Sequence, residues 1–99
     1  MIIGGDDQVL VQGMTGKQGT FWSERMIEYG TRIRAGVSPR KAGIIHCGVS
    51  VYASATDATD AAPIDATVLF IPPLGVKAAV LDAINAGIGK IVCLTEHVP

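Results

Sequence analysis

The sequence has little charge, only two cysteines and no long apolar run, and each shortage excludes a class of protein. Its 99 residues contain 8 Lys and Arg against 9 Asp and Glu, whereas a general nucleic-acid binder is normally strongly basic. Cys47 and Cys93 lack the spacing of a metal site and are too few for a disulfide framework. No stretch is long and apolar enough to cross a membrane, and the N-terminus lacks a signal-peptide pattern. We therefore expect a cytoplasmic protein without nucleic-acid, membrane or metal-ion partners.

What the chain does contain is apolar sequence in short runs that alternate with amphipathic stretches. The runs are apolar on both faces, which is typical of a parallel sheet covered by helices. Strands are expected at residues 8–12, 31–37, 48–52, 66–71 and 90–95. We predict an α/β fold with a Rossmann-like, doubly wound and mostly parallel sheet of about five strands, in a single domain that spans residues 1–99.

Two of the expected helices have recognisable features. Thr15 and Gln18 have the spacing of a capping box, which predicts a helix start near Gly16. Gly30 is placed to end this helix. Trp22, Met26 and Tyr29 share one face of this helix. In a later helix Val76, Val80 and Ile84 recur at helical spacing, with Leu81 beside them.

The segment GMTGKQG at residues 13–19 follows the first strand and suggests a phosphate-binding loop. A P-loop requires GxxxxGK followed by Ser or Thr, and Val11 and Gln18 occupy the two decisive positions, so a nucleoside-triphosphate site is excluded. The dinucleotide fingerprint GxGxxG is replaced by GxxGxxG. Glycines still allow close approach of an anion to the N–H groups of a helix N-terminus. A tight strand-to-helix turn without a ligand explains the glycines about equally well.

The loop after the second strand favours a ligand that carries an extra phosphate. In NAD-binding domains an acidic residue about 20 positions beyond the glycines binds the ribose 2′-hydroxyl. Here the corresponding residues are Ser38, Pro39, Arg40 and Lys41, with no acid among them. A cation at this place pairs with a phosphate on the ribose, so NADP and coenzyme A (CoA) are the two candidates. A solvated basic turn is the alternative.

Several segments taken together resemble a known family. In order, VQGMTGKQGTFWSERMIEYGT, GVSPRKAG, HCGVSVY, IPP and LTEHVP resemble the CoA-binding domain at the start of the α subunit of succinyl-CoA synthetase, an ADP- or GDP-forming acid-CoA ligase. The likeness runs from about residue 8 to residue 99. The chain departs from the family at Trp22, Arg40, Ala42, Ser50 and His97, where the family usually has His, Gly, Gly, Pro and Gly.

The resemblance implies a CoA site assembled from four segments. One would hold phosphate, one would supply a lysine, one would border the adenine, and the last would complete the site at the end of the final strand. In that order the implied CoA-binding residues are Thr15, Gly16, Lys17 and Gln18; Lys41; Ile71, Pro72 and Pro73; and Leu94, Thr95 and Glu96.

The resemblance also implies that catalysis is completed elsewhere. In the family, phosphoryl passes from a nucleotide to a histidine of the following domain and then to the acid, and CoA displaces the phosphate as a thioester. Neither His46 nor His97 lies in that motif, and His46 is expected to make local hydrogen bonds. No catalytic residue is therefore expected, and the isolated chain should be inactive.

The implied partners are the phosphohistidine domain and the nucleotide-binding β subunit, in an oligomer with a role in the tricarboxylic acid cycle. The chain would then be the front part of a longer α subunit. Two alternatives stay open: a stand-alone regulatory module that binds CoA or NADP without catalysis, and part of an NADP-dependent oxidoreductase.

Overall fold

The computed structural model describes residues 6–93. In chain order the elements are β1 Gln8–Gln12, α1 Lys17–Glu28, β2 Arg32–Val37, a short 3-10 helix η1 Pro39–Lys41, β3 Ile45–His46, β4 Val49–Tyr52, α2 Ala55–Ala61, β5 Ala66–Leu69, α3 Pro73–Asn85 and β6 Lys90–Cys93. None of the helices found in this range is long and apolar enough to span a membrane.

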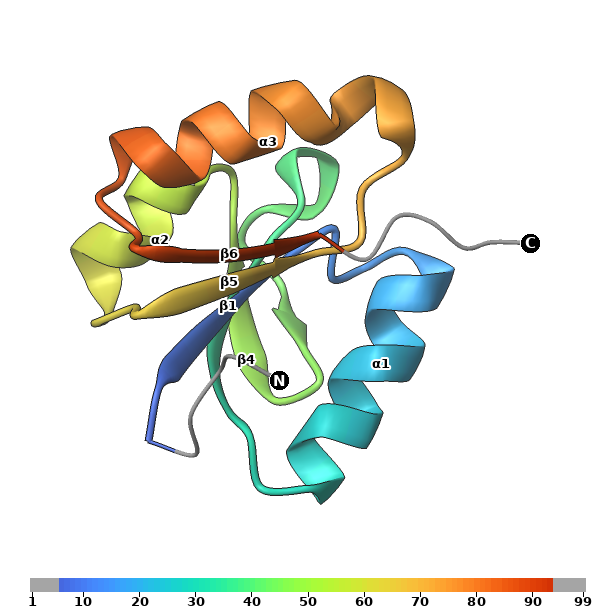
Figure 1. Ribbon diagram of the computed structural model, residues 1–99. Coiled ribbons are helices and arrows are strands. Elements are labelled where there is room, and N and C mark those ends of the chain that lie inside the picture. The colour runs from blue at the N-terminus through green and yellow to red at the C-terminus, as the bar shows by residue number, and fades with distance from the viewer. Residues whose placement is uncertain (1–5, 94–99) are drawn as a thin grey trace.

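The strands form one sheet in the order β3-β4-β2-β1-β5-β6, and within residues 6–93 only β3 runs antiparallel to its neighbour. Figure 1 shows α1 on one face of the sheet and α2 and α3 on the other. The chain builds outward from β1 to β2 and β4, then returns to place β5 on the opposite side of β1. The strand order therefore reverses at β1, where open α/β sheets bind their ligands. The predicted doubly wound α/β fold is confirmed.

The sequence predicts about five strands, and the structure has six. The additional strand is β3, which pairs Ile45 with Ser50 and His46 with Val49 of β4. A two-residue turn at Cys47 and Gly48 joins them, with φ values of +51° and +82°. Positive φ at both positions is what the type I′ turn of a two-residue hairpin requires. A strand of two residues is too short to produce a periodic pattern. The last two residues of the predicted strand 90–95 lie outside the described range.

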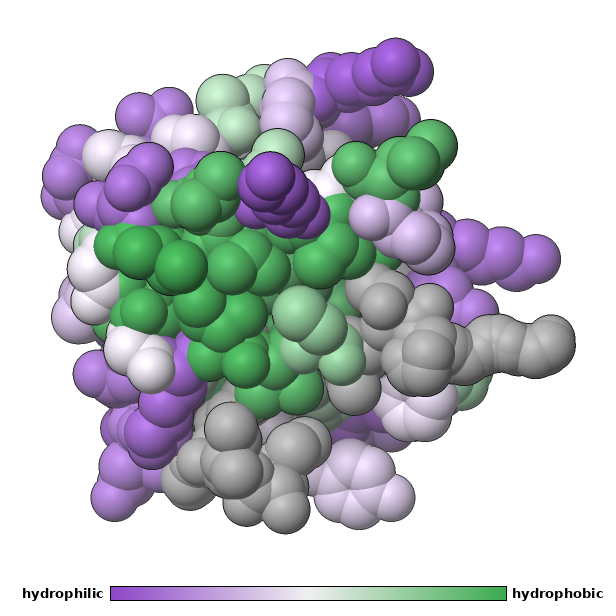
Figure 2. Space-filling view, turned by 45° about the horizontal axis from the view of Figure 1, so that its top comes forward, coloured by the Kyte–Doolittle hydropathy of each residue, from purple (hydrophilic) through white to green (hydrophobic). Residues whose placement is uncertain are grey.

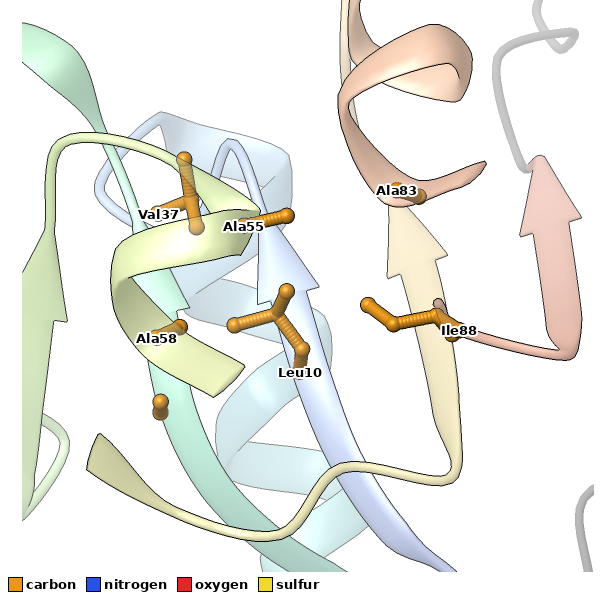
Figure 3. Close-up of a cluster of buried hydrophobic side chains, with 7 residues drawn as sticks. Leu10, Val37, Ala55, Ala58, Ala83 and Ile88 are labelled. Carbon is orange, nitrogen blue, oxygen red and sulfur yellow. The ribbon is translucent and has the colours of Figure 1, made fainter. Parts of the chain in front are cut away.

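Buried apolar side chains fill both sides of the sheet. Successive residues of a strand point to opposite faces, so Leu10 of β1 joins one cluster, whereas Val9 and Val11 join the other. Figure 3 shows the cluster beneath α2 and α3, in which both helices meet the sheet through alanines. Its buried members within residues 6–93 are Leu10, Ala35, Val37, Ala55, Ala58, Ala83 and Ile88. Small side chains here allow both helices to lie close to the strands.

The face that Trp22, Met26 and Tyr29 share is not the most deeply buried face of α1. Met26 packs against the core, but Trp22 and Tyr29 are 45% and 88% exposed. The buried helical positions are instead Gly19 and Ser23. Helical spacing indicates which residues share a face of the helix. Where the helix lies closest to the strands, however, only the smallest side chains fit.

The larger apolar residues of α3 are also buried only in part. Val76 and Val80 are half-buried, whereas Leu81 and Ile84 are 49% and 55% exposed, and the buried position is Ala83. Figure 2, in which α3 is turned toward the viewer, shows a broad apolar area on this side of the molecule. The helix is thus apolar on its outer side as well as toward the sheet.

Candidate functional site

Two cavities lie at the carboxyl end of the sheet, and Ile71 borders both. The first, about 340 Å³, is lined by residues 16–19 of the glycine loop and by residues 70–72. The second, about 270 Å³, lies between the ends of β1 and β2 and the start of α3. Both therefore occur where the strand order reverses, which is the expected position of a ligand.

A larger cavity of about 480 Å³ lies at the other side of β4, against α2. Among residues 6–93, Asp57 and Asp60 line it and no basic side chain does. Two carboxylates repel an anionic ligand, so this cavity does not suit the phosphate group that the sequence predicts.

The three glycines of the loop differ in what the fold demands of them. Gly13 has a φ of +83°, and a Cβ there would lie 2.3 Å from the carbonyl oxygen of Phe70. A Cβ on Gly19 would lie 2.1 Å from the carbonyl oxygen of Gly13. Gly16 has a φ of −72°, and its Cβ would meet only that same oxygen at 3.5 Å, an ordinary contact. Within residues 6–93 the fold requires glycine at positions 13 and 19 but not at 16.

Gly16 is also the N-cap of α1, and no side chain caps this helix. The first N–H groups of an α-helix have no partner within the helix, and the helix dipole makes its N-terminus favourable to negative charge. A ligand that approaches the Gly16 backbone closely would explain why a residue without a side chain stands there.

The predicted capping box is not formed. The hydroxyl of Thr15 is hydrogen-bonded to that of Ser38, with 2.6 Å between the oxygens, and so joins the loops after β1 and β2. The side-chain oxygen of Gln18 accepts a hydrogen bond from Nε1 of Trp22 at 3.2 Å. Each side chain has therefore found another partner, which leaves the helix end open.

A second polar link holds the glycine loop from the α1 side. The Thr20 hydroxyl donates to the carbonyl oxygen of Met14 at 3.1 Å and lies 2.8 Å from Nε2 of His46. Because the one hydroxyl proton is used on Met14, His46 must donate its Nε2 proton to Thr20. His46 thus makes the local hydrogen bond that the sequence predicts.

Gln12 anchors the floor of the second cavity, and the sequence analysis does not single it out. The side chain is 1% exposed at the end of β1. Its Nε2 donates to the carbonyl oxygen of Ala79 in α3 at 3.0 Å, and its Oε1 accepts from the Thr67 hydroxyl at 2.7 Å. A buried amide needs such partners, and they tie α3 to β1 and β5. The available signal is a glutamine at the end of an otherwise apolar buried strand.

Asp82 is another site residue that the sequence analysis does not identify. Its Oδ2 accepts a hydrogen bond from the backbone N–H of Ala55 at 2.7 Å, which joins α3 to the first residue of α2. Asp82 also borders the second cavity. Because Asp82 itself lies in the wall of this cavity, its carboxylate holds the start of α2 close to that wall.

The loop after β2 brings positive charge to this end of the molecule. Ser38 and Pro39 border the second cavity, and Arg40 and Lys41 follow in η1 with exposed side chains. Neither cation forms an ion pair with any other residue between 6 and 93, and the same holds for Lys17. All three charges are therefore available to a phosphorylated ligand.

The structure brings most of the predicted CoA-binding residues to one end of the sheet. Gly16, Lys17, Gln18, Ile71 and Pro72 line the first cavity. Thr15 is hydrogen-bonded to Ser38, which lines the second cavity, and Lys41 lies close by in the 3-10 helix η1. Pro73 begins α3 and lines neither cavity. Leu94, Thr95 and Glu96 lie outside the described residues. Which of these residues contact a ligand stays a prediction.

Two acid-CoA ligase subunits are similar to nearly the whole chain. It is 49% identical over 92 residues to the succinate–CoA ligase [ADP-forming] subunit alpha 2 of Archaeoglobus fulgidus. It is 45% identical over 94 residues to the ADP-forming sulfoacetate-CoA ligase subunit SqwL of Acholeplasma sp. These matches cover 93% and 95% of the chain but 32% of each relative, so the chain spans about a third of their length.

Solved structures of other proteins share this fold. A Rex-family repressor superposes with a TM-score of 0.75 at 22% identity, and the match covers 99% of this chain and 52% of the repressor. At this identity the likeness concerns the fold alone, and it agrees with the Rossmann-like architecture. Function is better addressed by the family model of the CoA binding domain, which matches residues 5–97. This confirms the resemblance seen in the sequence, and the chain belongs to the CoA binding domain family.

Proposed function

We propose that this chain binds coenzyme A as the CoA-binding module of a nucleotide-dependent acid-CoA ligase of the succinyl-CoA synthetase type. The observation that carries the proposal is the open start of α1 at Gly16, a glycine that the surrounding fold does not require. Membership of the CoA binding domain family and the names of the two relatives support the same ligand.

The pyrophosphate of CoA would bind at the start of α1. Backbone N–H groups of Lys17 and Gln18 would donate to its oxygens, with the helix dipole and the Lys17 charge adding to the attraction. The Thr15 hydroxyl, held beside Ser38, would contribute a further polar group at the edge of the loop.

The other parts of CoA would extend from this point along the two cavities. Lys41, together with Arg40, would pair with the 3′-phosphate of the ribose. Ile71, Pro72 and Pro73 would border the adenine, and the segment Leu94, Thr95 and Glu96 would complete the site. The two cavities that share Ile71 support one continuous binding path for an extended ligand.

The chemical steps would take place outside this chain. His46 is engaged with Thr20, so it is not a candidate for transient phosphorylation. We propose that the phosphohistidine domain follows in a longer α subunit and that a β subunit binds the nucleotide, in an oligomeric cytoplasmic enzyme. The relatives' names include both succinate and sulfoacetate as acids, so the acid would be selected away from the CoA site.

A second candidate is a regulatory module that binds CoA or NADP without catalysis. The observation that favours it is the loop after β2, which offers Arg40 and Lys41 and no acid, and so suits either phosphorylated ribose.

The test is calorimetric titration of the chain with CoA, dephospho-CoA and NADP. The proposal predicts binding of CoA, weaker binding of dephospho-CoA and still weaker binding of NADP. A preference for NADP would overturn it in favour of a redox or regulatory module. Equal affinity for CoA and dephospho-CoA would remove the 3′-phosphate contact from the proposal.

A further inference from the structure

Trp22 and Gln18 lie one helical turn apart on α1 and are joined by a hydrogen bond of 3.2 Å between Nε1 and Oε1. An indole N–H can only donate, so the atom of Gln18 that faces it must be the carboxamide oxygen. The amide NH₂ group of Gln18, with two N–H donors, is therefore the part that is left for another partner.

We infer that Trp22 is a positioning residue that orients the Gln18 carboxamide so that it donates to the phosphate of the bound ligand. This inference rests on the proposed function. Gln18 lines the first cavity beside Gly16 and Lys17, at the helix end where the anion would bind. Without a restraint, the carboxamide can also turn its oxygen toward the phosphate instead of its NH₂ group. Two acceptors would then face each other and repel. Engaging the oxygen with Trp22 removes that unproductive orientation.

The indole is itself held by a series of contacts along the outside of α1. The rings of Trp22 and Phe21 meet edge to face, with centroids 5.1 Å apart and planes at 89°. The Arg25 guanidinium lies 5.1 Å from the Phe21 centroid, and its Nε donates to Glu28 at 3.0 Å. The hydrogen bond with Glu28, and then its charge, raise the pKa of Arg25.

Packing alone does not account for a tryptophan at this position. The residue is 45% exposed, and it is not one of the buried or half-buried residues that form the two clusters within residues 6–93. The main structural consequence of this outward-facing tryptophan is therefore its hydrogen bond with Gln18, the side chain that is proposed to bind the ligand.

The test compares the wild-type chain with Trp22→Phe, Gln18→Ala and the double variant by calorimetric titration. Phenylalanine keeps an aromatic ring against Phe21 while it removes the N–H donor and part of the ring surface, and the double variant separates these two losses. We expect Trp22→Phe to weaken CoA and dephospho-CoA by the same factor, roughly three- to tenfold, because Gln18 acts on the pyrophosphate that both ligands share. In the Gln18→Ala background the same substitution should cause no further loss.

Tyr29→Phe is the matched control, since it removes a hydroxyl from an 88% exposed aromatic residue at the other end of α1. It should leave both affinities unchanged. Wild-type affinity in Trp22→Phe would overturn the inference while the proposed function stands. A loss that persists in the double variant would also overturn it, because the effect would then not pass through Gln18. Failure of the wild-type chain to bind CoA would overturn both.

Discussion

Replacing Gly16 by alanine should leave the domain folded and weaken its binding of CoA. The backbone already has an ordinary φ of −72°, and the new Cβ would meet only the Gly13 oxygen at 3.5 Å. Alanine is a poorer N-cap than glycine by up to about 1 kcal/mol. It also stabilises by about 0.4–1 kcal/mol because it restricts the unfolded chain. The two effects nearly cancel, so the melting temperature should change by no more than about 4–8 °C.

The same methyl group should be costly once CoA is bound, because under the proposed function it would stand between the first turn of α1 and the pyrophosphate. Loss of one charge-assisted contact corresponds to roughly 1–3 kcal/mol, or about a 5- to 150-fold loss of affinity. Circular dichroism would give the melting temperature and calorimetry the affinity. A variant that binds CoA like the wild type would refute the assignment of this loop to phosphate.

Two other glycine substitutions make the comparison sharp. Gly19→Ala places a Cβ 2.1 Å from a backbone oxygen and should destabilise the domain by about 1–3 kcal/mol, which lowers the melting temperature by at least about 4 °C. Gly89→Ala introduces a Cβ with no atom within 4 Å, so it should stabilise the domain by no more than the roughly 0.4–1 kcal/mol gained from restricting the unfolded chain and should leave CoA affinity unchanged. If Gly16→Ala melts as early as Gly19→Ala, then the fold does require glycine at position 16.

Three further predictions address the basic loop, the buried amide and the apolar surface. Lys41→Ala should weaken CoA about 5- to 150-fold and leave dephospho-CoA unchanged in calorimetry, and equal losses would remove Lys41 from the 3′-phosphate role. Gln12→Ala should lower the free energy of unfolding in urea by about 2–5 kcal/mol, since it leaves a cavity and two unpaired polar groups. Thr67→Val removes only one of those bonds and should cost less; an equal or greater loss would argue against the shared network. The half-exposed Leu81 and Ile84 should cause self-association in sedimentation, which lysine at both positions should suppress, and a monomeric wild-type chain would contradict this.

The main elements could be predicted because their signals are local. Apolar runs of strand length, ended by Gly13 or by Pro72, identify strands whatever their neighbours are. The strand β3 could not be predicted, because two residues show no periodicity and its hairpin uses Cys47 at a positive φ, which is unusual for that residue. The buried faces of α1 and α3 do not follow from the apolar pattern, for another reason. Hydrophobicity indicates which residues avoid water, but the distance between helix and sheet decides which side chains fit.

The candidate site divides in the same way. The glycine loop and the basic loop are recognisable in the sequence, and their position at adjacent strand ends follows from the parallel order. The hydrogen-bond partners do not follow, because Thr15, Ser38 and Trp22 each have several possible partners until the loops are placed. The capping box failed for this reason: Thr15 and Gln18 have the right spacing, yet each has a competing partner that only the tertiary structure provides.

The sequence by itself determined the α/β class, the family and the segment that could hold phosphate, because these depend on residue types and spacings along the chain. Tertiary structure alone decided which glycines the fold needs, since the clash at Gly19 is with an oxygen of Gly13 and the clash at Gly13 is with an oxygen of Phe70. It also decided that Gln12 joins α3 to the sheet. The contacts of Gly13 and Gln12 depend on distances between segments far apart in the chain, and the clash at Gly19 depends on how the loop folds back on the start of α1, so no pattern of residue types encodes them.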